Sequence, residues 1–146
     1  MGGILGAGAH GSVVEPTRVA AARSGHVVAV VGWPTGRHES VVKAAEARLA
    51  VERGAGEIWL ALDPDADESA MLADAIAVHQ GVSVPFGVIF CGPASVAAAE
   101  HSGADVLAVP DGVEVPATRL SVAVFGGGAS LRPGVARAFP AAAAQS

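Results

Sequence analysis

The chain has 146 residues, enough for one domain with a sizeable core, and 51% of them are hydrophobic. Nine Lys and Arg against 14 Asp and Glu give a net charge of −5, and the basic residues are scattered, so we expect no nucleic-acid partner. Cys91 is the only cysteine, so the chain cannot form an internal disulfide. A single thiol is typical of a protein in the reducing cytoplasm, where we expect this one. The first residues lack the basic and long apolar segments of a signal peptide.

Residues 1–11 are predicted to form a glycine-rich leader. Within them, residues 6–11 match the GxGxxG pattern of dinucleotide-binding turns in form. An acidic residue should end the next strand in such proteins, yet that strand ends at Val30-Val31-Gly32-Trp33. A flexible leader is therefore favoured over a cofactor site.

Strand and helix patterns alternate after the leader. Residues 27–31 form an unbroken β-branched run, which is typical of a parallel strand covered on both faces. Residues 39–53 read as a helix with Val42, Ala45 and Leu49 on its buried face. The other predicted strands are 12–14, 57–62, 84–90, 104–109 and 120–125, and the other predicted helices are 67–80, 93–101 and 131–138, before a frayed tail at 140–146. In the helix at 67–80, Asp67 is the expected cap, and Met71, Ala75 and Val78 are expected to point inward. The pattern indicates a mainly parallel sheet over residues 12–139, either doubly wound or part of a barrel.

Residues 80–99 carry no charge, which raises the question of a membrane helix. Pro85, Gly87, Gly92 and Pro93 interrupt this segment. A buried strand followed by a short helix is the better interpretation, so we expect no membrane partner.

The turn Val31-Gly32-Trp33-Pro34-Thr35-Gly36 resembles the VxGFPxG turn of the deoxyribose-phosphate aldolases. Residues 40–47, with Lys43 and Glu46, resemble the VKxxEA helix that follows this turn in that family. Weaker similarities appear in family order: residues 14–19 to V-x-P-x-x-V, 54–58 to GAxEIDMV, 102–106 to GADFVKTSTG, and 126–127 to KASGGIRT.

The resemblance implies an α/β fold of TIM-barrel type, here an incomplete barrel of about six strands, with an open doubly wound sheet as the alternative. It also implies class I aldolase chemistry without a metal or organic cofactor. In that chemistry a lysine forms a Schiff base during the reversible cleavage of 2-deoxy-D-ribose 5-phosphate to glyceraldehyde 3-phosphate and acetaldehyde.

The family's reactive residues are missing at the matching positions. The Schiff-base lysine falls on Ala108, its helper lysine on Ala123, and the family's aspartate on Trp59. None of these side chains can form or tune an imine, so we expect a catalytically impaired, pseudoenzyme-like aldolase relative. The alternative is a non-catalytic sugar-phosphate-binding or assembly subunit, and the sequence leaves open whether the chain is an enzyme.

The resemblance also predicts a phosphate site. The backbone N–H groups of Gly126, Gly127 and Gly112 match the family's phosphate-facing glycines. The alternative interpretation is that these glycines only form tight turns.

Four residues are candidates for the active face at the strand ends: Trp33, His38, Asp63 and Asp111. A histidine and two carboxylates could perform acid–base chemistry or hold a divalent ion, but ordinary turn formation is favoured for the two aspartates. Lys43 is the only lysine, and its place between Glu39 and Glu46 predicts a solvated ion pair rather than a catalytic amine.

Compared with the family, the chain starts near the second strand and stops after the seventh. The two missing strands would be neighbours, so their loss would leave two exposed barrel edges. We expect this gap to be covered by a second copy in a homo-oligomer, by the N-terminal segment, or by a partner chain.

Overall fold

The computed structural model describes residues 2–22 and 25–141. The strands are β1 (Ile4–Gly8), β2 (Gly11–Val14), β3 (Val27–Val31), β4 (Glu57–Leu60), β5 (Phe86–Ile89), β6 (Val106–Pro110), β7 (Ser121–Phe125) and β8 (Arg137–Phe139). The helices are α1 (Ser40–Glu52), α2 (Glu68–His79), α3 (Pro93–His101) and a 3₁₀ helix η1 (Pro16–Ala21).

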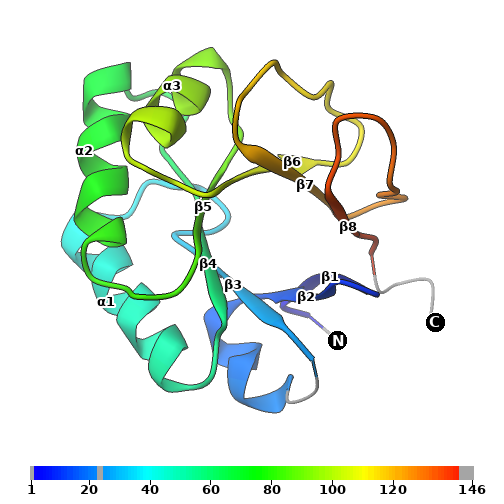
Figure 1. The fold of residues 1–146 in the computed structure, drawn as a ribbon. Coiled ribbons are helices and arrows are strands. Elements are labelled where there is room, and N and C mark those ends of the chain that lie inside the picture. Colours follow the sequence, from blue (N-terminus) through cyan, green and yellow to red (C-terminus); the bar gives the residue numbers. More distant parts are fainter. Residues whose placement is uncertain (1, 23–24, 142–146) are drawn as a thin grey trace.

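The eight strands form one sheet in chain order that curls into a barrel (Figure 1). β2 to β8 run parallel, whereas β1 pairs antiparallel with β2. β1 lies beside β8, where the N–H of Ala7 donates to the carbonyl oxygen of Pro140 at 2.9 Å. The fold is therefore TIM-barrel-like, as expected, and the open doubly wound alternative does not apply.

The sheet has two more strands than the sequence predicted. One is β1, which lies within the segment expected to be a flexible leader, so the N-terminal segment is what covers the expected gap. The other is β8, which replaces the end of the helix predicted over residues 131–138. That helix prediction is wrong. Most of the tail predicted at 140–146 lies outside the described residues.

The GxGxxG segment forms the β1–β2 hairpin rather than a strand-to-helix turn. Gly6 allows close approach to β8, because a Cβ there would lie 2.1 Å from the carbonyl oxygen of Phe139. The segment thus closes the barrel seam, and the context of a dinucleotide fingerprint is absent.

This packing predicts a contrast between two glycines of β1. Gly6→Ala should lower the free energy of unfolding by about 1–3 kcal/mol, because the new methyl group collides with backbone. Gly8→Ala is the control, since a Cβ there would lie 3.4 Å from Pro140, near ordinary contact distance. Urea denaturation of both variants measures the difference, and equal losses would contradict this account of the seam.

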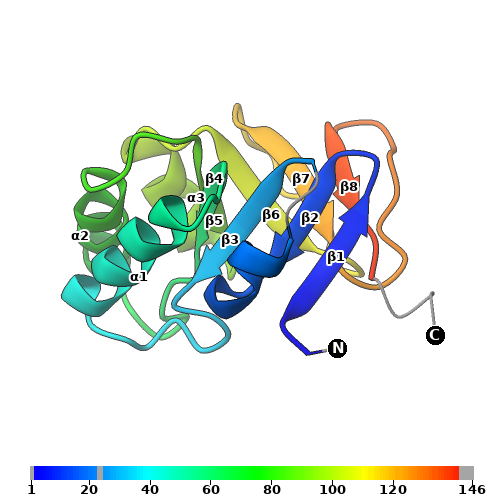
Figure 2. The same cartoon turned by 90° about the horizontal axis from the view of Figure 1, so that it is seen from below.

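Helices cover only part of the barrel. α1, α2 and α3 lie outside β3 to β6, while β7 and β8 are reached by long loops without helices (Figures 1 and 2). The outer core contains residues from these loops, Val115, Leu120, Ala129 and Val135, which pack with the outward-facing side chains of the sheet. The loops therefore cover the outer face of β7 and β8, as the helices cover the outer face of β3 to β6.

The buried face of α1 is not the one predicted. Lys43, Ala47 and Ala50 are buried, whereas Val42 is 52% exposed and Leu49 is 48% exposed. Two polar contacts set the orientation of α1 instead of its apolar periodicity: Lys43 pairs with Asp74, and Glu46 accepts the N–H of Gly32.

The middle of the chain follows the prediction more closely. The Asp67 side chain caps α2 by accepting the N–H of Ala70 at 2.8 Å, and Met71, Ala75 and Val78 are buried as expected. The uncharged segment 80–99 contains β5 and most of α3. Among the described helices, none has both the length and the apolar character that crossing a membrane requires.

Candidate functional site

The three positions that the resemblance assigns to the family's reactive residues lie together inside the barrel. Trp59 on β4, Ala108 on β6 and Ala123 on β7 are all fully buried and belong to one interior cluster. The register of β6 and β7 places Ala108 directly beside Ala123. The interior that the resemblance designates for chemistry is therefore lined here by apolar side chains.

Trp59 fills the middle of this interior. Its ring lies 5.5 Å from the rings of both Phe125 and Phe139, measured between centroids. Gly87 on the neighbouring strand makes room for the indole, because a Cβ there would lie 2.7 Å from the Trp59 ring. Aromatic and aliphatic side chains thus pack around the Trp59 ring and fill this layer.

An ionic cluster lies below this aromatic layer, at the start of the strands. Glu57, the first residue of β4, accepts two hydrogen bonds from the guanidinium of Arg137 on β8, at 2.8 and 2.7 Å. It also accepts the indole N–H of Trp59 at 2.7 Å and lies 2.8 Å from Nε2 of His26. These contacts join β4 to β8 across the barrel.

The Glu57–Arg137 pair is ionised. Burial raises the pKa of Glu57, but the hydrogen bonds from Arg137, His26 and Trp59 outweigh this effect and hold it below its ordinary value. The same carboxylate raises the pKa of Arg137. Because active sites of this fold lie at the carboxyl ends of the strands, a pair at the opposite end has a structural role.

Lys43 is locked in a buried ion pair rather than solvated. Lys43 is 1% exposed, and its Nζ donates to Oδ2 of Asp74 on α2 at 2.5 Å. The other oxygen of Asp74 accepts the hydroxyl of Ser40 at 2.6 Å. Glu46, expected beside Lys43 as an ion-pair partner, instead accepts the N–H of Gly32 at 2.9 Å. The expectation of a solvated lysine is therefore wrong.

His38 and Asp63 line the same cleft as Lys43, a hollow of about 240 Å³ between α1 and α2. Asp63 accepts the N–H of Asp65 at 2.9 Å, the contact of an ordinary turn, and lies 3.5 Å from Nε of Arg37. The structure thus brings together two of the four residues proposed for the active face.

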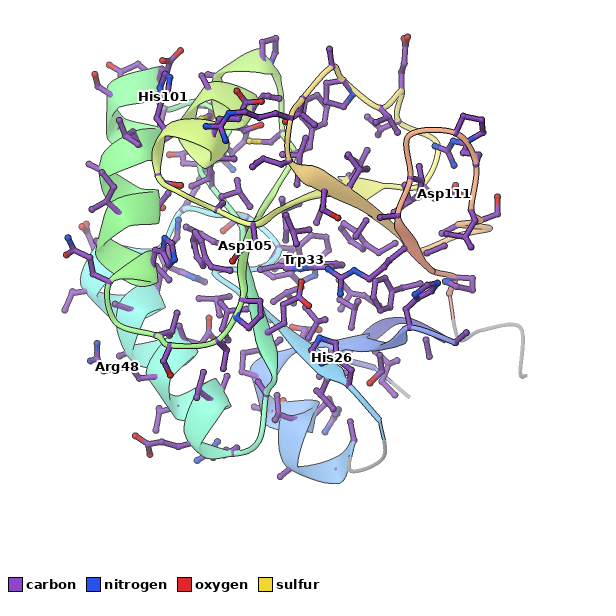
Figure 3. The ribbon with its side chains drawn as sticks, viewed as in Figure 1. His26, Trp33, Arg48, His101, Asp105 and Asp111 are labelled. Carbon is purple, nitrogen blue, oxygen red and sulfur yellow. The ribbon has the colours of Figure 1, made fainter. Side chains whose placement is uncertain are left out.

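The other two lie elsewhere (Figure 3). Trp33 is half-buried and packs against Phe125 with ring centroids 5.8 Å apart, next to the interior cluster. Asp111 contacts the glycine turn after β7, where its Oδ2 accepts the N–H of Gly128 at 2.9 Å.

The glycines proposed to bind phosphate are partly engaged within the chain. The N–H of Gly126 donates to the carbonyl oxygen of Phe139 at 2.9 Å. Gly127 and Gly112 both have a positive φ, of 47° and 87°. Phosphate binding at these three glycines stays a prediction.

Cys91 and the acidic residues offer little further chemistry. Burial raises the pKa of the Cys91 thiol, which disfavours the reactive thiolate. Across residues 2–22 and 25–141, no group of three or more His, Cys, Asp or Glu side chains is arranged to hold a metal ion.

Sequence reasoning missed Glu57, Arg137 and Asp74 as the partners that organise the interior and the cleft. Glu57 lies two residues before Trp59 on a predicted strand, so their shared face could have been predicted. Arg137 falls in the helix predicted over residues 131–138, and a helix there gives no indication that its side chain reaches Glu57 inside the barrel.

Together, the curled, mainly parallel sheet and the helices outside it define a TIM-barrel-like (β/α) protein with an apolar layer in its interior. No family model matches the chain. It is 42% identical over 81 residues to the deoxyribose-phosphate aldolase of Nocardia farcinica, covering 52% of this chain and 36% of that protein. It is 43% identical over 63 residues to that of Corynebacterium jeikeium, covering 40% of this chain and 25% of that protein.

Solved structures agree on the fold. A Coccidioides immitis protein provisionally named as this aldolase superposes with a TM-score of 0.72 at 19% identity, covering 91% of this chain and 69% of that one. The tetrameric deoxyribose-phosphate aldolase of Aeropyrum pernix gives 0.64 at 21% identity, covering 81% and 64%. The chain is therefore similar to deoxyribose-phosphate aldolases over about half of its own length, and the matched segments span 36% and 25% of these two curated relatives.

Proposed function

We propose that this chain is a deoxyribose-phosphate aldolase-like protein that does not carry out imine chemistry. The observation that carries the proposal is the interior layer, where Trp59 packs with Ala108 and Ala123 at the positions of the family's reactive side chains. An imine needs an amine at the reacting carbon, and this layer supplies none.

The chain's only lysine does not replace the missing ones. Lys43 lies on α1, outside the barrel, and its Nζ is held by the carboxylate of Asp74. Lys43 is also only 1% exposed, so its amine is neither free nor presented to a carbonyl carbon inside the barrel.

A turnover assay tests the proposal. The purified chain is incubated with 2-deoxy-D-ribose 5-phosphate, and acetaldehyde release is followed by NMR beside the Nocardia farcinica relative. We expect no release above the rate of a blank. Release that persists after repurification, and is lost on Lys43→Met, would overturn the proposal.

A second candidate function is assembly with a second copy of this chain. It is supported by three exposed apolar side chains on α1: Val41 at 72%, Val42 at 52% and Leu49 at 48%. The Aeropyrum pernix neighbour is described as a tetramer. Light scattering after size exclusion tests this candidate: a homo-oligomer that dissociates on Val42→Lys supports it, and a stable monomer excludes it.

A further inference from the structure

The loop after β6 and the glycine turn after β7 meet through Asp111 (Figure 3). Its backbone N–H donates to the carbonyl oxygen of Phe125 at 2.9 Å, which fixes the residue at the carboxyl end of β7. Its side chain then reaches the N–H of Gly128, also at 2.9 Å. Asp111 is therefore held at both its backbone and its carboxylate.

Gly127 allows this carboxylate to lie against the turn. A Cβ at Gly127 would lie 2.5 Å from Oδ2 of Asp111. The φ of Gly127 is +47°, a conformation that residues other than glycine rarely adopt. The backbone thus approaches an anion as closely as glycine permits, and that anion belongs to the protein.

The N–H groups of the turn are largely used. Gly126 donates to Phe139, Gly128 to Asp111, and Ala129 to the carbonyl oxygen of Gly126. Only Asp111 among these acceptors is a carboxylate. Clustered backbone N–H groups attract negative charge, and here the attraction is satisfied within the chain.

We infer that Asp111 is a specificity-determining residue, whose carboxylate occupies the anion position of the turn at residues 126–128 and excludes phosphate from it. The inference rests on the proposed function in taking the chain as an aldolase-like barrel, and it opposes the phosphate site that the resemblance predicts at Gly126 and Gly127. A fixed negative charge in contact with the turn rejects a second anion by repulsion, a common means of specificity.

The test uses inorganic phosphate as the probe and the backbone amide NMR signals of residues 126–128 as the readout, with the full chain. The wild type should show no saturable shift. Asp111→Asn keeps the shape and an oxygen acceptor but removes the charge, so it should bind phosphate on the order of tenfold more tightly or better. Asp111→Ala, which also opens space, should gain at least as much.

The control is Glu114→Gln, which removes the same charge from an exposed residue of the same loop. It should leave phosphate binding at the turn unchanged. A saturable shift in the wild type, no gain in Asp111→Asn, or an equal gain in Glu114→Gln would each overturn the inference. Circular dichroism verifies folding, and Asp111→Asn keeps the test decisive if Asp111→Ala does not fold.

The turnover assay on the same wild-type sample separates this inference from the proposed function. A chain that releases acetaldehyde yet excludes phosphate from the turn would refute the proposed function and retain the role of Asp111. A silent chain that binds phosphate at the turn would do the reverse.

Discussion

Replacing Arg137 with methionine is expected to lower the free energy of unfolding by about 3–5 kcal/mol. The substitution leaves the Glu57 carboxylate, whose side chain is 3% exposed, without the two hydrogen bonds that the guanidinium donates. Only the contacts with His26 and Trp59 then remain, and a buried charge that loses its main partner costs far more than the pair contributes. Urea denaturation at neutral pH measures the loss.

The matched control is Arg119→Met. Arg119 is 67% exposed and lies 3.9 Å from Glu100, so its ion pair is screened by solvent and its loss should have little measurable effect. The double variant Arg137→Met with Glu57→Gln should regain part of the stability lost in Arg137→Met, because it removes the unpaired charge. If Arg137→Met were no more destabilising than Arg119→Met, the ionic cluster would not stabilise the barrel.

The same cluster predicts how stability depends on pH. The folded-state pKa of Glu57 lies below its ordinary value, so its ionised contacts stabilise the protein above the unfolded-state pKa. That contribution is lost as the pH falls through the folded-state pKa. The stability difference between the wild type and Glu57→Gln should therefore shrink in acid, and a difference that grew in acid would contradict the assignment.

Trp59→Ala is expected to cost about 3–5 kcal/mol, the range for truncating a large buried aromatic residue. The indole is fully buried, packs on Phe125 and Phe139, and donates its N–H to Glu57. Trp33→Ala is the control, because Trp33 is half-buried and contacts the same Phe125 ring. Urea denaturation should give the smaller loss for Trp33→Ala, and equal losses would show that Trp59 does not anchor the interior.

The sequence predicted the fold best where local and tertiary preferences agree. The bounds of β3 and α3 match the prediction, and α2 buries the expected face, because an unbroken β-branched run and a capped helix leave few alternatives. The α1 face was wrong because polar partners from other elements, Asp74 and the N–H of Gly32, orient that helix. Such partners are distant in sequence and leave no periodic signal.

The two ends of the chain were harder to predict for a related reason. Gly6 of β1 makes room for the backbone of Phe139 on β8, so a glycine that suggested a flexible leader reflects packing in the fold. β8 is only three residues long, too short for an alternating pattern to identify it. Its first residue, Arg137, is explained only by Glu57, which lies 80 positions away in the chain.

The candidate site was partly predictable. The resemblance brought Trp59, Ala108 and Ala123 together, and they share one interior cluster. It did not indicate that Gly87 makes room for the indole, or that Asp111 lies against the glycine turn, since both are contacts between strands or loops. Physical complementarity of this kind is visible only once the backbone is placed.

Reductive trapping tests the central claim most directly. The chain is incubated with acetaldehyde and borohydride, and its intact mass is compared with that of the Nocardia farcinica relative treated in the same way. We expect the relative to gain the mass of a reduced imine and this chain to gain none at a lysine. A stoichiometric adduct that maps to Lys43 would show that its pairing with Asp74 does not prevent imine chemistry, and it would contradict the account.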